Sequence, residues 1–175
     1  SEFYSSKERK YEIMQGKFLA AADMVDYYVQ LAKDFPIVSI EDPFEEESFA
    51  AFAELTKKLS MANVQVVGDD LLVTNVDRIR EAVRRNSCNC LLLKVNQIGT
   101  LSEAVAAANL AVNNGWRVMV SHRSGETEDA FISDLAVALG CGQIKSGAPA
   151  RSERTAKYNR LLRIEEELGG KSQYG

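Results

Sequence analysis

Five short apolar runs in the sequence each lead directly into charged or polar side chains. In chain order, these side chains are Glu41, Asp42, Asp69, Asp70, Lys94, Ser121, His122, Arg123, Ser124 and Lys145. If the runs are parallel strands, their carboxyl ends lie at one edge of the sheet, where parallel α/β folds hold their ligands. We therefore expect these residues to line a single site.

The carboxylates in this set indicate a site for a hard, oxygen-liganded cation. No cysteines or histidines with metal-ligand spacing accompany them, and Mg²⁺ is the commonest such cation where a phosphorylated substrate supplies further oxygens. Glu41 and one of the two aspartates, Asp69 or Asp70, could hold it. Because neighbouring strand residues point to opposite faces, Asp69 and Asp70 are not expected to share one role.

The basic and hydroxyl residues indicate an anion site and a general base. Arg123 offers a planar fork of donors that suits a phosphate, and Ser121 or Ser124 could add a hydroxyl group. Lys94 and Lys145 follow two of the runs, and both like charge and desolvation would favour a neutral amine on Lys94. A neutral Lys94 could remove a carbon-bound proton beside a metal-held carboxylate.

Each of these features also has an ordinary structural interpretation when taken singly. A lysine after a leucine run is usually a strand-end charge that reaches water, and Asp-Asp and Glu-Asp-Pro are common in turns. The only histidine, His122, would by default be a structural residue. The coincidence of complementary groups after five runs favours a functional site.

The elements that must position these groups follow a repeated plan of strand, polar junction and helix. The predicted strands span 37–40, 64–67, 91–95, 117–120 and 143–144, roughly 24 to 28 residues apart, which is the length of one βα unit. The predicted helices span 17–35, 48–59, 76–85, 101–113, 127–139 and 152–168. Thr100 and Glu103 predict a capping box for the fourth helix, and residues 1–16 are interpreted as a polar lead-in.

Five consecutive βα units predict a parallel sheet with right-handed crossovers. Two architectures satisfy this pattern. A doubly wound five-stranded sheet would be a complete domain at 175 residues, whereas an eight-stranded barrel typically needs about 250 residues and would be present only in part. The pattern alone favours the complete domain.

Composition excludes several other classes of protein. The chain is 46% hydrophobic and 26% charged, as is usual for a globular domain. Its 21 basic and 25 acidic residues give a net charge of −4, so nucleic acid and an anionic membrane are not expected partners. No apolar run approaches the roughly 20 residues of a membrane span. We expect a soluble cytoplasmic protein with reduced, mostly buried cysteines at Cys88, Cys90 and Cys141.

Long strings of this sequence resemble the enolase family, the phosphopyruvate hydratases. SIEDPF, GDDLLVTN, LLLKVNQIGT, VMVSHRSGETED and GQIKSGAPARSERTAKYNRLLRIEEEL stand in the family's order and nearly at its spacing. The resemblance covers 1–168 and is to the C-terminal part of the family's barrel domain. It implies a TIM-like α/β barrel with about five of the eight strands, so that 1–175 would be one incomplete domain.

The resemblance also implies a role for each candidate residue. Lys94 would be the general base and His122 a catalytic residue beside the substrate. Glu41 and Asp69 would be ligands of Mg²⁺ that also contact the substrate. The other residues expected to bind 2-phosphoglycerate or phosphoenolpyruvate are Ser121, Arg123 and Ser124 on the phosphate side and Lys145 at the carboxylate. The full-length form would be a homodimer.

Several parts of an enolase are not expected within these residues. They are the N-terminal domain with its mobile loop, the glutamates of the general-acid half, a substrate-binding histidine and a third metal-binding aspartate. We therefore expect the isolated 175 residues to be catalytically inactive. A half-barrel that acts as a binding or scaffold module is the alternative. A flavodoxin-like nucleotide binder is disfavoured, because no glycine-rich loop follows the first predicted strand.

Overall fold

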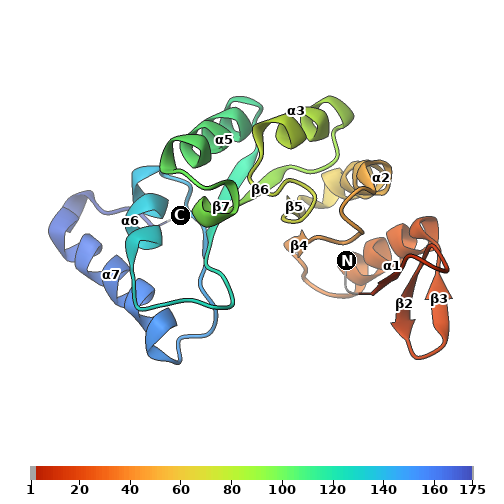
Figure 1. Ribbon diagram of the computed structural model, residues 1–175, viewed down its shortest axis with the longest axis horizontal. Helices are drawn as coiled ribbons and strands as arrows, with labels where there is room; N and C mark the ends of the chain where they lie inside the picture. The colour runs from red at the N-terminus through yellow and green to blue at the C-terminus, as the bar shows by residue number, and fades with distance from the viewer. Residues whose placement is uncertain (1–2, 175) are drawn as a thin grey trace.

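The computed structural model describes residues 3–174 and contains two separate sheets (Figure 1). Residues 1, 2 and 175, which the predicted domain and lead-in include, lie outside the described part. The first sheet is antiparallel, with β1 (Tyr4–Ser5), β2 (Lys10–Met14) and β3 (Lys17–Leu19) side by side. The polar lead-in was therefore a wrong interpretation. Tyr11 is buried against the core, and Gly16 has a φ of 74° between β2 and β3.

The first helix, α1 (Ala21–Asp34), begins later than predicted. Lys17 to Leu19 pair with β2, so their apolar side chains belong to a strand. The helix buries Met24 and Val25 and ends before Pro36, as predicted.

The second sheet is parallel and its five strands lie in chain order. They are β4 (Ser39–Glu41), β5 (Gln65–Gly68), β6 (Cys90–Leu93), β7 (Arg117–Ser121) and β8 (Ile144–Lys145). Every neighbouring pair is parallel. A doubly wound sheet reverses its strand order at a switch point. The unbroken order excludes that architecture and leaves a curled half-barrel (Figure 1).

Helices follow the strands on the convex side of this sheet (Figure 1). They are α2 (Phe49–Leu59), α3 (Val76–Arg85), α5 (Leu101–Asn113), α6 (Phe131–Ala138) and α7 (Ser152–Leu168), with 3₁₀ turns at η1 (Ser60–Ala62) and η2 (Gly169–Lys171). The bounds of α3, α5 and α7 are those predicted. Thr100 caps α5 by accepting from the N–H of Glu103 at 3.2 Å, and the Glu103 carboxylate accepts from the Thr100 hydroxyl.

Two stretches differ from the prediction for local reasons. The strand predicted to reach Val95 ends at Leu93, and a short helix, α4 (Val95–Ile98), follows and ends at Gly99 with a φ of 116°. The helix predicted from Thr127 begins at Phe131. Before it, Asp129 accepts from the N–H of Phe131 at 2.8 Å, so side chains there replace the first helical hydrogen bonds.

The two faces of the parallel sheet have different cores. The convex face packs against the helices in one large cluster that includes Val66, Leu91, Leu93, Val118 and Val120. The concave face carries a small cluster of Val67, Cys90 and Leu92, with Met119 against it. Within residues 3–174, no helix is long and apolar enough to cross a membrane.

All three cysteines are free thiols, as expected. Cys88 and Cys90 are buried and Cys141 is partly exposed. Burial raises the pKa of Cys90 to about 12 and also raises that of Cys88. The two buried thiols therefore serve as small apolar side chains.

Gly68 is a position where the fold leaves little room. A Cβ there would lie 2.7 Å from Cγ of the fully buried Leu72. We expect Gly68→Ala to lower the free energy of unfolding by about 1–3 kcal/mol in urea denaturation, since overpacking a core forces side chains to shift. Gly170→Ala, where a Cβ meets nothing within 4 Å, is the control. Equal stability of the two variants would contradict this account.

Candidate active site

The strand register places the predicted site residues on the concave face. Residues paired in register on parallel strands point to the same side of the sheet. Glu41 pairs with Val67, which belongs to the concave cluster. The alternation of strand side chains then places Asp69, Lys94 and Ser121 on this face, and Lys145 pairs with Ser121.

Two ion pairs cross the concave face. Lys94 Nζ lies 2.7 Å and 2.6 Å from the two carboxylate oxygens of Asp69, and each side chain is only 12% exposed. Lys145 Nζ lies 2.5 Å from Oε1 of Glu41. The second pair joins β8 to β4, the opposite edges of the sheet, so the curl brings these two edges within side-chain reach.

These pairs alter the expected surroundings of the two lysines. The sequence suggested that Lys94 and Lys145 act on each other by like charge. In the structure each ammonium donates to a carboxylate on another strand. Each lysine is therefore held beside an acidic group. Each ion pair connects the ends of two strands.

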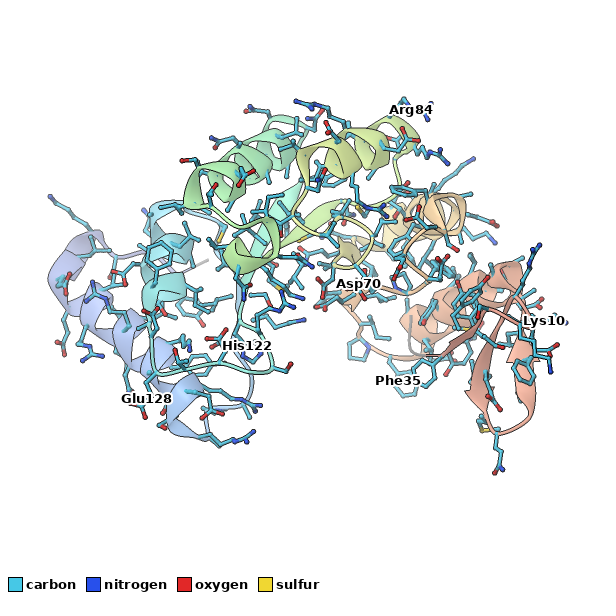
Figure 2. All side chains as sticks on the ribbon, viewed as in Figure 1. Lys10, Phe35, Asp70, Arg84, His122 and Glu128 are labelled. Atoms are coloured by element: carbon cyan, nitrogen blue, oxygen red, sulfur yellow. The ribbon has the colours of Figure 1, made fainter. Side chains whose placement is uncertain are left out.

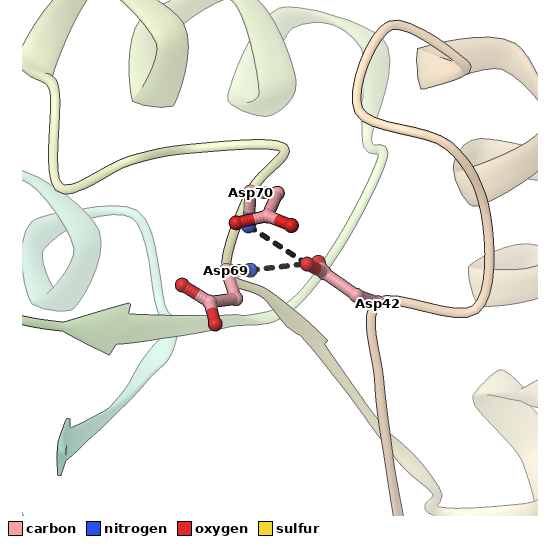
Figure 3. Close-up of side chains that lie close together, drawn as sticks. All are labelled: Asp42, Asp69 and Asp70. Carbon is pink, nitrogen blue, oxygen red and sulfur yellow. Dashed lines mark hydrogen bonds between the residues drawn. The ribbon is translucent and has the colours of Figure 1, made fainter. Parts of the chain in front are cut away.

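Asp42 supports the end of β5. Its two carboxylate oxygens accept from the backbone N–H groups of Asp69, at 2.8 Å, and Asp70, at 2.7 Å (Figure 3). Burial raises the pKa of Asp42 to about 6, although these two hydrogen bonds lower it. Asp42 itself has a φ of 41°, which agrees with the turn chemistry of Glu-Asp-Pro. No role had been predicted for Asp42, because its partners lie far along the chain.

The carboxylates offer a donor set that suits a hard cation. Asp42, Asp69 and Asp70 each have an oxygen within 4.8 Å of the others, whereas Glu41 is outside this group. Both oxygens of Asp42 already accept N–H groups, and Figure 3 shows the Asp69 carboxylate pointing away from them. The partner of Asp69 is the side-chain ammonium of Lys94, which can move, whereas the partners of Asp42 are backbone N–H groups, so Asp69 fits a ligand role better than Asp42. Glu41 shares the concave face with Asp69, and an all-oxygen set of this kind is what Mg²⁺ prefers.

The polypeptide after β7 carries the predicted phosphate-side residues. The N–H of His122 donates to the carbonyl of Lys145 at 2.9 Å, which ties this segment to β8. Arg123 and Ser124 are exposed, and Arg123 lies 3.4 Å from the side-chain oxygen of Asn96 on α4. Asn96 was not singled out in the sequence, since α4 itself was not predicted. Exposed donors at this edge can meet an incoming anion.

His122 lies toward the open side of the half-barrel, away from α3 and α5 (Figure 2). Burial lowers its pKa below the ordinary value of 6.5. Its Nδ1 is buried with no hydrogen-bond partner among the described residues. Ser121 is buried and its hydroxyl donates to the carbonyl of His122 at 2.9 Å. Burial thus favours the neutral form of the His122 imidazole.

A parallel half-barrel with ionisable groups at the carboxyl ends of its strands places the chain in the TIM-barrel class of folds. The model for "Enolase, C-terminal TIM barrel domain" matches residues 1–175. The chain therefore belongs to the enolase family.

Relatives named enolase match nearly the whole chain. The chain is 59% identical to the enolase of Methanopyrus kandleri over 175 residues, which are 100% of this chain and 40% of that protein. It is 61% identical to the enolase of Methanocaldococcus jannaschii over 97% of this chain and 38% of that protein. The enolase of Eimeria tenella is 54% identical over 99% of this chain and 40% of that protein. The chain spans about two fifths of the length of these relatives.

The raised pKa of Asp42 makes a prediction about stability and pH. The folded protein holds a proton on Asp42 up to a pH of about 6, whereas the ordinary value is 3.8. This proton contributes to the free energy of unfolding in full below pH 3.8. The contribution is lost as the pH rises toward about 6. The wild type should therefore lose more free energy of unfolding than Asp42→Asn between pH of about 4 and about 7, measured in urea.

The control for this comparison is Asp26→Asn, which removes an exposed carboxylate. The difference in free energy of unfolding between Asp26→Asn and the wild type should change less over the same pH range. A wild type that gains stability relative to Asp42→Asn on raising the pH would mean that the two N–H bonds outweigh burial.

Proposed function

We propose that the complete polypeptide that contains these residues is a phosphopyruvate hydratase, which interconverts 2-phosphoglycerate and phosphoenolpyruvate. The observation that carries the proposal is the contact of Lys94 Nζ with both oxygens of Asp69 on the concave face. The residue proposed as the base thus lies beside the carboxylate proposed to bind the cation, which supports removal of a proton next to a metal-held carboxylate. The Lys base with Mg²⁺ is the known scheme of this superfamily, and these residues agree with it.

Lys94 would take the proton from carbon 2 of 2-phosphoglycerate on Nζ. For this, its ammonium must first lose a proton and its hold on Asp69. The hydroxide that leaves carbon 3 departs as water, with its proton supplied by an acid outside the described residues. Electrons of the broken C–H bond form the carbon–carbon double bond of phosphoenolpyruvate.

The remaining residues would bind and orient the substrate. Arg123 and Ser124 are exposed donors for the phosphate, with Ser121 buried beneath them. Lys145 would contact the substrate carboxylate, and His122 would act beside the substrate as a neutral imidazole, in agreement with its lowered pKa. Glu41 and Asp69 would hold Mg²⁺, which supplies positive charge that favours the enolate form of the substrate.

This proposal includes the cellular setting expected for such an enzyme. We propose a cytoplasmic, homodimeric protein in its full-length form, active in glycolysis and gluconeogenesis. A native mass well above the 19.3 kDa of these residues, found with an antibody against them, is the expected result. A mass near 19.3 kDa would instead favour a binding or scaffold module without catalysis.

Lys94→Ala tests the base directly. In the complete polypeptide, we expect this variant to lose exchange of the carbon 2 proton of 2-phosphoglycerate with solvent deuterium, by a factor of about 10³ or more. The control is Lys58→Ala, which removes a lysine paired with Asp26 and Glu54 on the helical surface. Exchange that persists in Lys94→Ala would refute the assignment of the base.

The isolated residues 1–175 should not turn over 2-phosphoglycerate, because the acid half of the reaction needs groups outside them. A matched chimera provides the positive control: the enolase of M. jannaschii in which the aligned 169 residues are replaced by this sequence, 61% identical to them. We expect the chimera to be active in an assay of phosphoenolpyruvate absorbance. Turnover by the isolated chain that disappears in its Lys94→Ala variant would contradict the proposal.

A further inference from the structure

Lys157 of α7 is a charged residue whose side chain is completely buried. Its Nζ donates to the carbonyls of Thr127 and Glu153, both at 2.6 Å, and forms an ion pair with Oε2 of Glu126 at 2.8 Å. A buried ammonium costs several kcal/mol unless it is paired and its donors are satisfied. Lys157 therefore holds the segment around Glu126 and Thr127 to α7.

Glu126 passes this restraint on to Arg123. Its second oxygen, Oε1, accepts from the backbone N–H of Arg123 at 2.7 Å. The Glu126 side chain is 18% exposed, so one carboxylate connects a buried helix residue to an exposed loop residue. The result is a continuous path of charge-assisted hydrogen bonds from α7 to Arg123, each stronger than a neutral one.

The packing of α7 against α6 does not depend on this path alone. Arg160 of α7 forms a bidentate pair with Asp134 of α6, with distances of 3.0 Å and 2.6 Å. The hydroxyl of Ser133 also donates to the carbonyl of Lys157 at 2.9 Å. The helices thus have contacts of their own, and the ammonium of Lys157 is directed at the loop.

We propose that Lys157 and Glu126 are positioning residues for the anionic group of the substrate. They set the conformation of residues 122–127 before the substrate binds. Arg123 and Ser124 are then already oriented toward the incoming phosphate. α7 thereby controls the affinity for the phosphorylated substrate through contacts that do not reach it. This inference rests on the proposed function.

The test uses the complete polypeptide and the variants Glu126→Gln and Lys157→Met. Glu126→Gln keeps an acceptor for the N–H of Arg123 but gives up the ion pair, and Lys157→Met keeps most of the buried stem. We expect the KM for 2-phosphoglycerate to rise about tenfold or more, with a smaller change in kcat. Inhibition by inorganic phosphate should weaken by a similar factor. The two substitutions should be non-additive when combined, because they remove one path.

A second measurement does not depend on catalysis. Trypsin cleaves after arginine, and Arg123 is exposed in a restrained loop. Cleavage between Arg123 and Ser124 should be about tenfold faster in both variants under native conditions, since release of the loop raises the population of cleavable conformations. Arg160→Gln, which breaks the pair between α6 and α7, should leave both this cleavage rate and the KM unchanged.

The outcomes separate this inference from the proposed function. The positioning role would be overturned if Glu126→Gln and Lys157→Met lower the melting temperature but have the same KM and the same rate of cleavage after Arg123 as Arg160→Gln. If Lys157→Met does not fold, Glu126→Gln decides by the same readouts. If the wild type does not convert 2-phosphoglycerate, the proposed function fails, whereas faster cleavage and weaker binding of inorganic phosphate by the variants would still support the positioning role.

Discussion

The ion pair between Glu41 and Lys145 joins the two edge strands of the parallel sheet, and the rest of the concave site depends on that closure. The two atoms can lie 2.5 Å apart only if the sheet curls until β4 faces β8. A second contact supports the same curl at the amino ends of the strands, where the side-chain amides of Gln65 and Gln143 exchange hydrogen bonds at 3.0 Å. In a flat sheet the same residues would form a row. In the curled sheet they face one another across a shared space.

Charge removed from water is the second constraint on this fold. Lys94 and Asp69 are 12% exposed, and Lys157 is completely buried, so each needs partners close at hand. On the concave face, Lys94 and Asp69 follow neighbouring strands and pair with each other. Under the proposed function, Lys94 would exchange this partner for the substrate and Asp69 would exchange it for the cation. In the α7 region, the three acceptors around Lys157 occupy all three N–H groups of its ammonium, so none is available to a ligand. Under the proposed function, the same residue type would take part in chemistry at Lys94 and support the fold at Lys157, according to what surrounds its ammonium.

Local patterns predicted those elements whose signals are contained in their own residues. The bounds of α3, α5 and α7 follow from apolar periodicity and caps, among them Asn75, which accepts from the N–H groups of Asp77 and Arg78. The antiparallel sheet of β1 to β3 escaped prediction because its strands have only two to five residues. The short α4 escaped because it has only four residues, which is too few to show helical periodicity.

The sequence by itself determined that five βα units exist, that ionisable groups follow their strands and, through long specific strings, which family these residues resemble. Only the tertiary structure decided between a doubly wound sheet and a half-barrel, paired Lys94 with Asp69 rather than with Lys145, and gave roles to Asp42, Glu126 and Lys157. The physical reason is the range of the interactions. Periodicity and capping act within a few residues, whereas the contacts of Gln65 with Gln143 and of Glu41 with Lys145 join positions 78 and 104 residues apart. Such contacts exist only after the strands have taken their order and the sheet has curled.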